Sequence, residues 1–216
     1  MKELNKRIAG IPIPPRMRGL PLSDEGYPIP YFVPFIDGKA DFRGMDGEKL
    51  GRCIRLKRCW LCGQPLGKFM VFVIGPMCTV NRNSAEPPSH RSCAEYAVLA
   101  CPFLTQPRMR RNEKDMPEGS VSGIMIKRNP GVTALWVTSE YKLRRGSGTL
   151  FAIGNPIEVK FYTEGRISTR AEILVSIDSG MPILMQYARA DGQEAVDELN
   201  EMYHTALTLL PKEEVP

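Results

Sequence analysis

The chain has 216 residues, of which 43% are hydrophobic and 25% are charged. These values are ordinary for a globular domain and exclude a disordered or fibrous chain. Glycine and proline contribute 19 residues each, which excludes a simple helical bundle because both residues interrupt helices. The net charge of +5 is unevenly distributed, since residues 51–145 carry 16 basic and 6 acidic side chains, whereas residues 146–216 carry 5 and 11. The basic middle predicts either a surface for an anionic partner or internal neutralisation by the acidic C-terminal part.

The first predicted region, residues 1–50, is a proline-rich extended arm. Seven prolines occur in its first 36 residues, and each fixes φ and removes a backbone donor. Apolar residues lie between the prolines, so we expect the arm to pack along the domain in a polyproline-like conformation. Asp46-Gly47 is typical of a turn. The segment 48–57 that follows is compatible with either a helix or a strand.

The most specific motif lies in the second region, residues 51–104. Cys59-Trp-Leu-Cys62-Gly63 is followed by His90-Arg-Ser-Cys93. Each pair has the two-residue spacing that lets both side chains face one ion, and thiolate and imidazole are the ligands of tetrahedral zinc. Six cysteines in a chain without an apolar signal segment also favour a metal over disulfides. We therefore predict one structural Zn²⁺ with Cys59, Cys62, His90 and Cys93 as ligands, which leave no coordination position open for catalysis.

The elements expected around this motif follow a recognisable order. Residues 67–74 predict a buried strand, residues 77–80 are expected to return beside it as a hairpin, and residues 90–101 predict a helix. Over residues 57–101, the sequence of knuckle, hairpin and helix resembles the treble-clef zinc finger. The resemblance implies a zinc-bound scaffold, in a family whose members bind nucleic acids, proteins or lipids or act as nucleases.

A second resemblance bears on location. The segments CWLCG, GPMC, AEPPSHRSCAEY and CPFL are similar to an uncharacterised group of bacterial and phage proteins, which implies no activity. With the lack of an apolar signal segment, we expect a cytoplasmic location, bacterial or in the host of a phage. No apolar run reaches the roughly 20 residues that a membrane span needs, so no membrane association is expected.

The third and fourth regions complete an α+β fold, and the four regions are expected to form one compact unit. Residues 105–165 predict an antiparallel sheet, with strand candidates at 122–126, 132–141, 150–153 and 157–162. Residues 166–216 predict helices. Thr169 and Glu172 fit a capping box, Gly180 and Pro182 predict a break near residue 180, and a second helix is expected over 191–210.

Three functional hypotheses follow, and binding is favoured over catalysis. The first is a protein-interaction or assembly module that uses the arm or the C-terminal helices, where Met181, Met185 and Met202 would suit an adaptable surface. The second is a nucleic-acid-binding protein that uses the basic segment 51–145. Its candidate contact residues are Arg55, Lys57, Arg58, Arg108, Arg110, Arg111, Lys142, Arg144 and Arg145.

The third hypothesis is an enzyme with a site near the zinc module, in the loop 81–89 with Arg82, Asn83 and Glu86. The residue inventory disfavours it. The chain has two histidines, and once His90 is a ligand only His204 remains, on a predicted acidic helix. The remaining cysteines, Cys53, Cys78 and Cys101, are expected to be buried structural residues.

Overall fold

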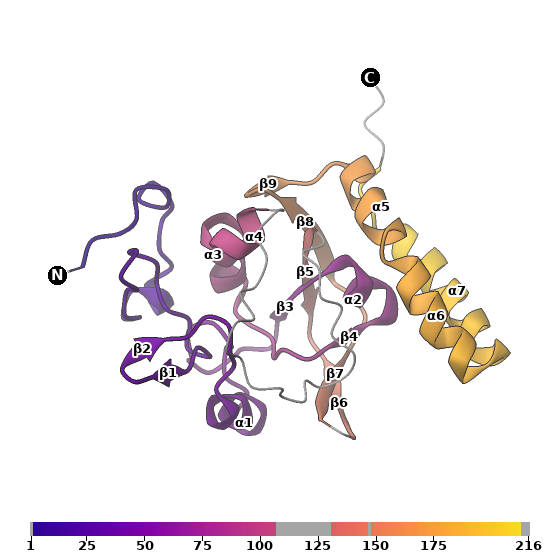
Figure 1. The fold of residues 1–216 in the computed structure, drawn as a ribbon, viewed down its shortest axis with the longest axis horizontal. Coiled ribbons are helices and arrows are strands. Elements are labelled where there is room, and N and C mark those ends of the chain that lie inside the picture. The colour runs from indigo at the N-terminus through magenta and orange to yellow at the C-terminus, as the bar shows by residue number, and fades with distance from the viewer. Residues whose placement is uncertain (1, 107–130, 147, 213–216) are drawn as a thin grey trace.

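Residues 2–106, 131–146 and 148–212 are described in the computed structural model, and they form a mixed fold of helices and antiparallel sheets (Figure 1). The N-terminal part contains a 3₁₀ turn at Pro15–Met17, a small hairpin of β1 (Phe35–Ile36) and β2 (Lys39–Ala40), and helix α1 (Gly47–Leu56). The predicted strand at residues 122–126 lies outside the described residues.

The central sheet has four antiparallel strands in the order β3-β5-β8-β9. Their bounds are Met70–Ile74 for β3, Thr133–Thr138 for β5, Glu158–Thr163 for β8 and Arg166–Ile167 for β9. Every residue of β5 is buried, because side chains alternate between two covered faces. Ala134 and Trp136 join the main core, whereas Leu135 and Val137 pack against the opposite face. The strand expected at 157–162 is therefore confirmed as β8, and the one expected at 132–141 is confirmed as β5 up to Thr138, whereas Tyr141 belongs to a different sheet.

A second antiparallel sheet shares the main core. It has the order β4-β7-β6, with β4 at Asn83–Ser84, β6 at Tyr141–Arg145 and β7 at Thr149–Ile153. Phe151 of β7 and Tyr141 of β6 meet Phe72 of β3, with ring centroids 5.3–5.9 Å apart. This aromatic cluster joins the two sheets.

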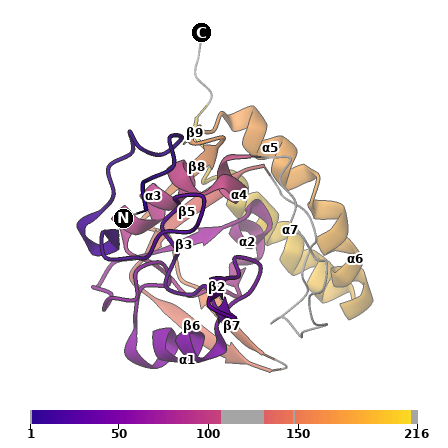
Figure 2. The same ribbon diagram turned by 60° about the vertical axis from the view of Figure 1, so that its left-hand side comes forward.

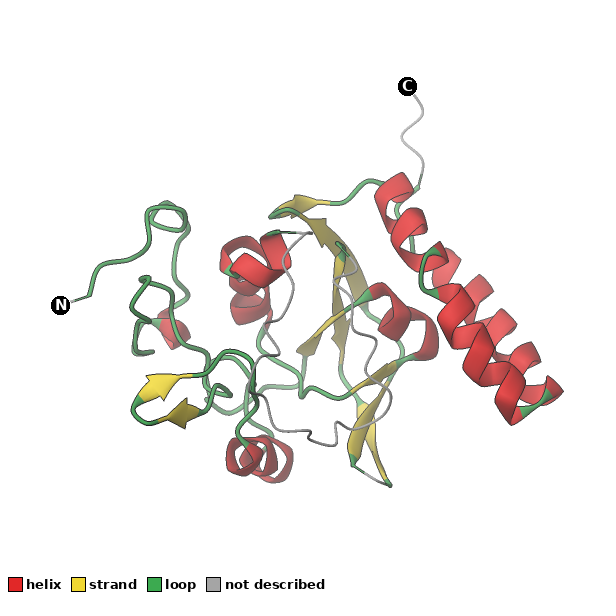
Figure 3. Ribbon diagram, in the orientation of Figure 1, coloured by secondary structure: helices red, strands yellow, loops and turns green. Residues whose placement is uncertain are grey.

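Three C-terminal helices cover the other side of the main core (Figure 3). They are α5 (Arg170–Asp178), α6 (Met181–Asp191) and α7 (Gln193–Leu207). Thr169 and Glu172 form the predicted capping box, and the predicted break falls at Gly180. The break at Gly180 packs closely on the Met77 side chain of helix α2 (Pro76–Asn81), so a Cβ at this position would displace that side chain.

The predicted methionine surface is largely used for packing. Met181, Met185 and Met202 are partly buried against the main core. The helices therefore serve first to cover the core, as in an ordinary layered fold.

The structure corrects one predicted element and decides one that the sequence left open. Residues 77–80 belong to helix α2, so the predicted returning strand is wrong; Pro76 at the first helical turn starts a helix instead. The open segment 48–57 is helical, because the side chain of Asp46 accepts a hydrogen bond from the Lys49 amide as an N-cap.

The helix predicted at 90–101 is confirmed as α3 (Arg91–Ala100), followed by the short α4 (Pro102–Thr105). Helix α3 packs on the face of the central sheet opposite the main core, where Ala94 and Val98 contact Val71, Leu135 and Val137. Its first turn lies beside the segment that carries Cys59 and Cys62, and both pairs of cysteine and histidine residues are thereby brought to one place.

Candidate metal centre

The first pair of candidate ligands, Cys59 and Cys62, lies on a tight turn at residues 59–64, the predicted zinc knuckle. The Gly63 amide donates to the Cys59 carbonyl and the Cys59 amide donates to the Gln64 carbonyl, each at 2.8 Å. Gly63 has φ +72°, and a Cβ there would lie 2.6 Å from Cδ2 of Tyr31. Glycine therefore satisfies two needs at once, a left-handed backbone and the close approach of the Tyr31 ring.

The second pair of candidate ligands, His90 and Cys93, is held near the knuckle by a single β-bridge between two segments distant in sequence. Ser89 and Val71 exchange two backbone hydrogen bonds of 2.8 Å. This antiparallel bridge ends at His90, the N-cap of α3, and Cys93 follows in the first turn. The Trp60 amide also donates to the Pro88 carbonyl at 3.1 Å, which ties the knuckle directly to the segment before the helix.

The four side chains form one compact group that could hold a metal ion. Their ligand atoms, from Cys59, Cys62, His90 and Cys93, all lie within 4.8 Å of one another. His90 Nδ1 lies 3.4 Å from Cys62 Sγ and 4.0 Å from Cys93 Sγ. The amides of Cys62 and His90 each donate to Cys59 Sγ at 3.4 Å, as amides do around metal thiolates. Cys59 and Cys93 are fully buried.

The imidazole of His90 is oriented by its other nitrogen. Nε2 lies 2.9 Å from the Pro65 carbonyl oxygen, and because a carbonyl only accepts, Nε2 is the donor. The lone pair of Nδ1 is then free to face the three sulfurs. A ligand histidine with its second nitrogen bonded to a carbonyl is typical of metal sites.

The three thiols differ in how readily they ionise. Hydrogen bonds from Cys62 and Cys93 hold the pKa of Cys59 far below its usual value. The pKa of Cys62 and that of Cys93 are raised, first by their hydrogen bonds with Cys59. Protein groups alone thus favour one thiolate in this cluster, and a bound cation is the group that would stabilise three.

The N-terminal arm covers this centre. Ile8 and Met17 are buried in one cluster with Cys59, Cys62 and Cys93. Phe32 of the arm stacks on Trp60, with ring centroids 4.8 Å apart and an interplanar angle of 12°, and the Tyr31 amide donates to the Leu61 carbonyl at 2.8 Å. The side chains that fix the arm are therefore the same ones that flank the ligands.

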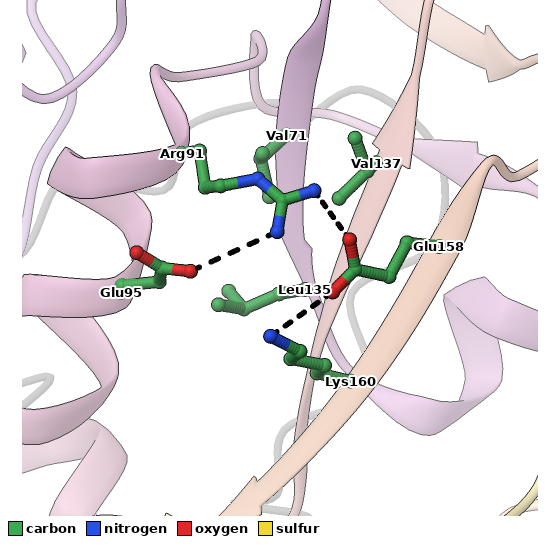
Figure 4. A pocket seen from close by; sticks show the side chains of 7 residues that line it. All are labelled: Val71, Arg91, Glu95, Leu135, Val137, Glu158 and Lys160. Carbon is green, nitrogen blue, oxygen red and sulfur yellow. Dashed lines mark hydrogen bonds and ion pairs between the residues drawn. The ribbon is translucent and has the colours of Figure 1, made fainter.

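An ion-pair network connects α3 to the central sheet beside the centre (Figure 4). Arg91, which follows His90, pairs with Glu158 of β8, and Lys160 pairs with the same carboxylate at 3.0 Å. Arg91 also lies 3.9 Å from Glu95. The Arg91 guanidinium, and after it Lys160, lower the pKa of Glu158 to about 2. These charges pair with one another, so Arg91 fixes the helix that carries two of the candidate ligands to the central sheet.

The nine predicted nucleic-acid contacts are not all placed together. Arg55, Lys57, Lys142 and Arg144 are exposed, on α1 and its C-cap or on β6. Arg58 is half-buried and donates to the Gly63 carbonyl at 2.8 Å, so it supports the knuckle. Arg108, Arg110 and Arg111 lie outside the described residues, and Arg145 is described only as backbone of β6.

One basic residue was missed by the sequence reasoning. Arg52 is exposed and lies one helical turn before Arg55 on α1. The signal that would have found it was Asp46 as an N-cap, since a helix from residue 47 puts positions 52 and 55 on one face.

The residues considered for an enzyme site are engaged elsewhere or dispersed. Arg82 donates to Asn155 at 3.0 Å, and Asn83 donates to the Asn81 carbonyl at 2.7 Å. Glu86 and His204 are exposed. Among the other cysteines, Cys53 is buried, whereas Cys78 and Cys101 are half-buried.

Comparison of the chain with models of protein families, with curated proteins and with solved structures gave no match. Within the described residues, no helix has the length and apolar character needed to cross a bilayer.

Proposed function

We propose that the chain is a zinc-stabilised binding protein, in which Cys59, Cys62, His90 and Cys93 hold one structural Zn²⁺. The observation that carries the proposal is the convergence of four ligand atoms within 4.8 Å. Three sulfurs and one imidazole are a donor set that suits zinc and not magnesium or calcium. Four protein ligands complete its tetrahedral shell, so the ion would stabilise the fold. It would have no open coordination position at which a substrate or a catalytic water could bind.

Residues 57–101 are further proposed to be a treble-clef module. In support, the knuckle is followed by β3, by the bridge of Val71 with Ser89 and by α3 with the second ligand pair. The departure from the simple pattern is that α2 and β4 are inserted between the two paired segments. Free thiols throughout the described chain fit a reducing cytoplasmic location.

We assign partner binding to exposed surfaces of the scaffold that the zinc would stabilise. Apolar side chains of the arm such as Ile8 and Met17 are buried against the knuckle, so they are not exposed to a partner. In contrast, Phe35, Ile36 and Phe42 remain about half exposed, at 50%, 55% and 49%, in and beside the β1–β2 hairpin. Exposed apolar groups held on a fixed scaffold are typical of sites that bind a macromolecule.

Metal content tests this proposal. The protein purified without chelator is measured by native mass spectrometry and by elemental analysis, beside Cys62→Ser and Cys101→Ser. We expect one zinc per chain in the wild type and in Cys101→Ser, which alters a cysteine outside the group, and none in Cys62→Ser. A wild-type protein that is folded and free of zinc would overturn the proposal, as would undiminished zinc in Cys62→Ser.

A further inference from the structure

An exposed group of basic side chains on α1 and β6 forms no ion pair with any acidic residue in the described part of the chain. The α1–β6 basic surface is defined by five exposed residues, Arg52, Arg55, Lys57, Lys142 and Arg144. By contrast, basic residues elsewhere in the described chain form ion pairs, for example Lys160 with Glu158 and Arg166 with Glu172. The surface therefore carries free positive charge.

The two elements of this surface lie at the same end of the molecule. Tyr141 and Leu143 of β6 pack on the main core, and Ile54 of α1 packs on that core too. Alternation along the strand puts Lys142 and Arg144 on the opposite, outer side. Figures 1 and 2 both show α1 and the β6–β7 hairpin at the lower end, away from helices α5–α7.

The acidic C-terminal helices do not supply the missing counter-charges. Glu194, Asp197, Glu198 and Glu201 are exposed on α7, and none of them pairs with a basic residue of the described chain. The described residues of α7 therefore form no ion pair that would neutralise the α1–β6 basic surface.

Exposed aromatic rings lie near both ends of α1. The Phe35 ring is 50% exposed, and its centroid lies 5.7 Å from Nζ of Lys49, in the first turn of the helix. At the other end, the Leu66 amide donates to the Lys57 carbonyl at 2.8 Å. Phe69, three residues later, is 58% exposed. Each of these two exposed rings also has a lysine beside it, Lys49 at Phe35 and Lys68 at Phe69.

We propose that this surface binds a single-stranded nucleic acid, with phosphates on the five cations and bases stacked on Phe35 and Phe69. Cations along a surface with aromatic rings for stacking are the means by which proteins hold single strands without reading sequence. A duplex could use the cations, but its stacked bases would leave both rings without partners. This inference names the partner of the binding protein proposed above and rests on that proposal.

Salt-dependent binding tests the electrostatic part. Fluorescence anisotropy is recorded for the zinc-loaded full chain with labelled oligothymidylate and oligouridylate of about 16 nucleotides. A matched duplex is measured beside them, between about 50 and 200 mM salt. If all five cations contact phosphates, the logarithm of affinity falls with the logarithm of salt with a slope of about −3.5 for a single strand. The two single strands distinguish DNA from RNA.

Charge and stacking variants separate the contributions. Arg52→Gln, Arg55→Gln and Lys142→Gln should each make the slope shallower by about 0.7, whereas Arg189→Gln, an exposed arginine on α6, should leave it unchanged. Phe35→Leu and Phe69→Leu should weaken single-strand binding about fivefold or more. Tyr187→Leu, which alters an exposed ring on α6, is the matched control.

Three outcomes would overturn the inference. The first is salt-independent or absent binding, and the second is wild-type affinity in the arginine and lysine variants. The third is displacement of the oligonucleotide by an acidic polypeptide of equal charge, together with no effect of the phenylalanine variants, which would indicate an acidic protein partner.

Zinc content is measured on the same samples. One zinc per chain with no oligonucleotide binding contradicts only the binding inference for this surface, whereas a folded protein without zinc contradicts the proposed function.

Discussion

The Nε2 atom of His90 donates a hydrogen bond of 2.9 Å to the carbonyl oxygen of Pro65. His90 caps α3, whereas Pro65 closes the knuckle through its bridge with Arg58. The orientation of one candidate ligand therefore depends on the segment that holds two others. The two ligand pairs are coupled through the protein as well as through any ion they share.

The first prediction concerns this histidine. His90→Ala should lose zinc, because three thiolates leave the shell incomplete, whereas His90→Cys should retain it, since Cys₄ is also a structural zinc set. Competition with a zinc-binding dye measures the affinities. Equal zinc affinity in His90→Ala and the wild type would show that the imidazole is not a ligand.

The second prediction concerns the knuckle glycine. Gly63→Ala should lower the free energy of unfolding by about 1–3 kcal/mol and weaken zinc binding, because the new Cβ would lie 2.6 Å from the Tyr31 ring at φ +72°. Gly67→Ala is the matched control, since nothing lies within 4 Å of its Cβ. Chemical denaturation followed by circular dichroism compares the two, and equal stability would contradict the knuckle geometry.

The third prediction concerns metal removal. Cys59, Cys62 and Cys93 form part of the cluster that buries the arm, whereas Trp136, Ile173 and the C-terminal helices belong to the main core. A structural zinc contributes on the order of 10 kcal/mol to folding, so chelation should release the knuckle and the arm first. Hydrogen exchange should then rise at the Tyr31 and Gly63 amides while β5 stays protected.

A uniform rise of exchange across both clusters on chelation would contradict that order of events. The control is the same chelator added to Cys62→Ser. If that variant lacks zinc as expected, its exchange should not change further.

The fourth prediction concerns pH. Arg166, and after it the Thr169 amide, lower the pKa of Glu172 from its usual 4.5 to about 2. A carboxyl whose pKa is lower in the folded state stabilises the fold above its ordinary pKa and loses that contribution as the pH falls from about 4.5 to 2. Carbon-detected NMR should show the Glu172 midpoint near 2 in the wild type and closer to 4.5 in Arg166→Gln. An unchanged midpoint would contradict the ion pair.

Features governed by short sequence spacing were predictable. The ligand pairs, the Thr169 capping box and the break at Gly180 each depend on residues within four positions of one another, where helix and knuckle geometry is fixed locally. The alternation that marked β5 and β8 is local for the same reason.

Features that depend on distant partners were not predictable. Gly75-Pro76 suits a turn as well as a helix start, and the strand partner of β3 is the distant β5, where Val71 pairs with Val137. On its other side, Val71 meets Ser89 in a single bridge that is too short to leave a periodic pattern. Asp46-Gly47 is typical of a turn in sequence, although in the structure Asp46 is a helix N-cap. The α1–β6 basic surface joins Arg52 to Lys142 across 90 positions of the sequence, and only tertiary structure brings them to one end.

X-ray absorption at the zinc edge of the purified protein tests the central claim most directly. For a structural Cys₃His site, we predict about three sulfur atoms near 2.3 Å and one nitrogen near 2.0 Å from the zinc. The sulfur count should fall to two in any Cys62→Ser protein loaded with zinc. A shell made mainly of oxygen and nitrogen, or a folded protein that contains no zinc, would contradict the assignment of Cys59, Cys62, His90 and Cys93 as its ligands.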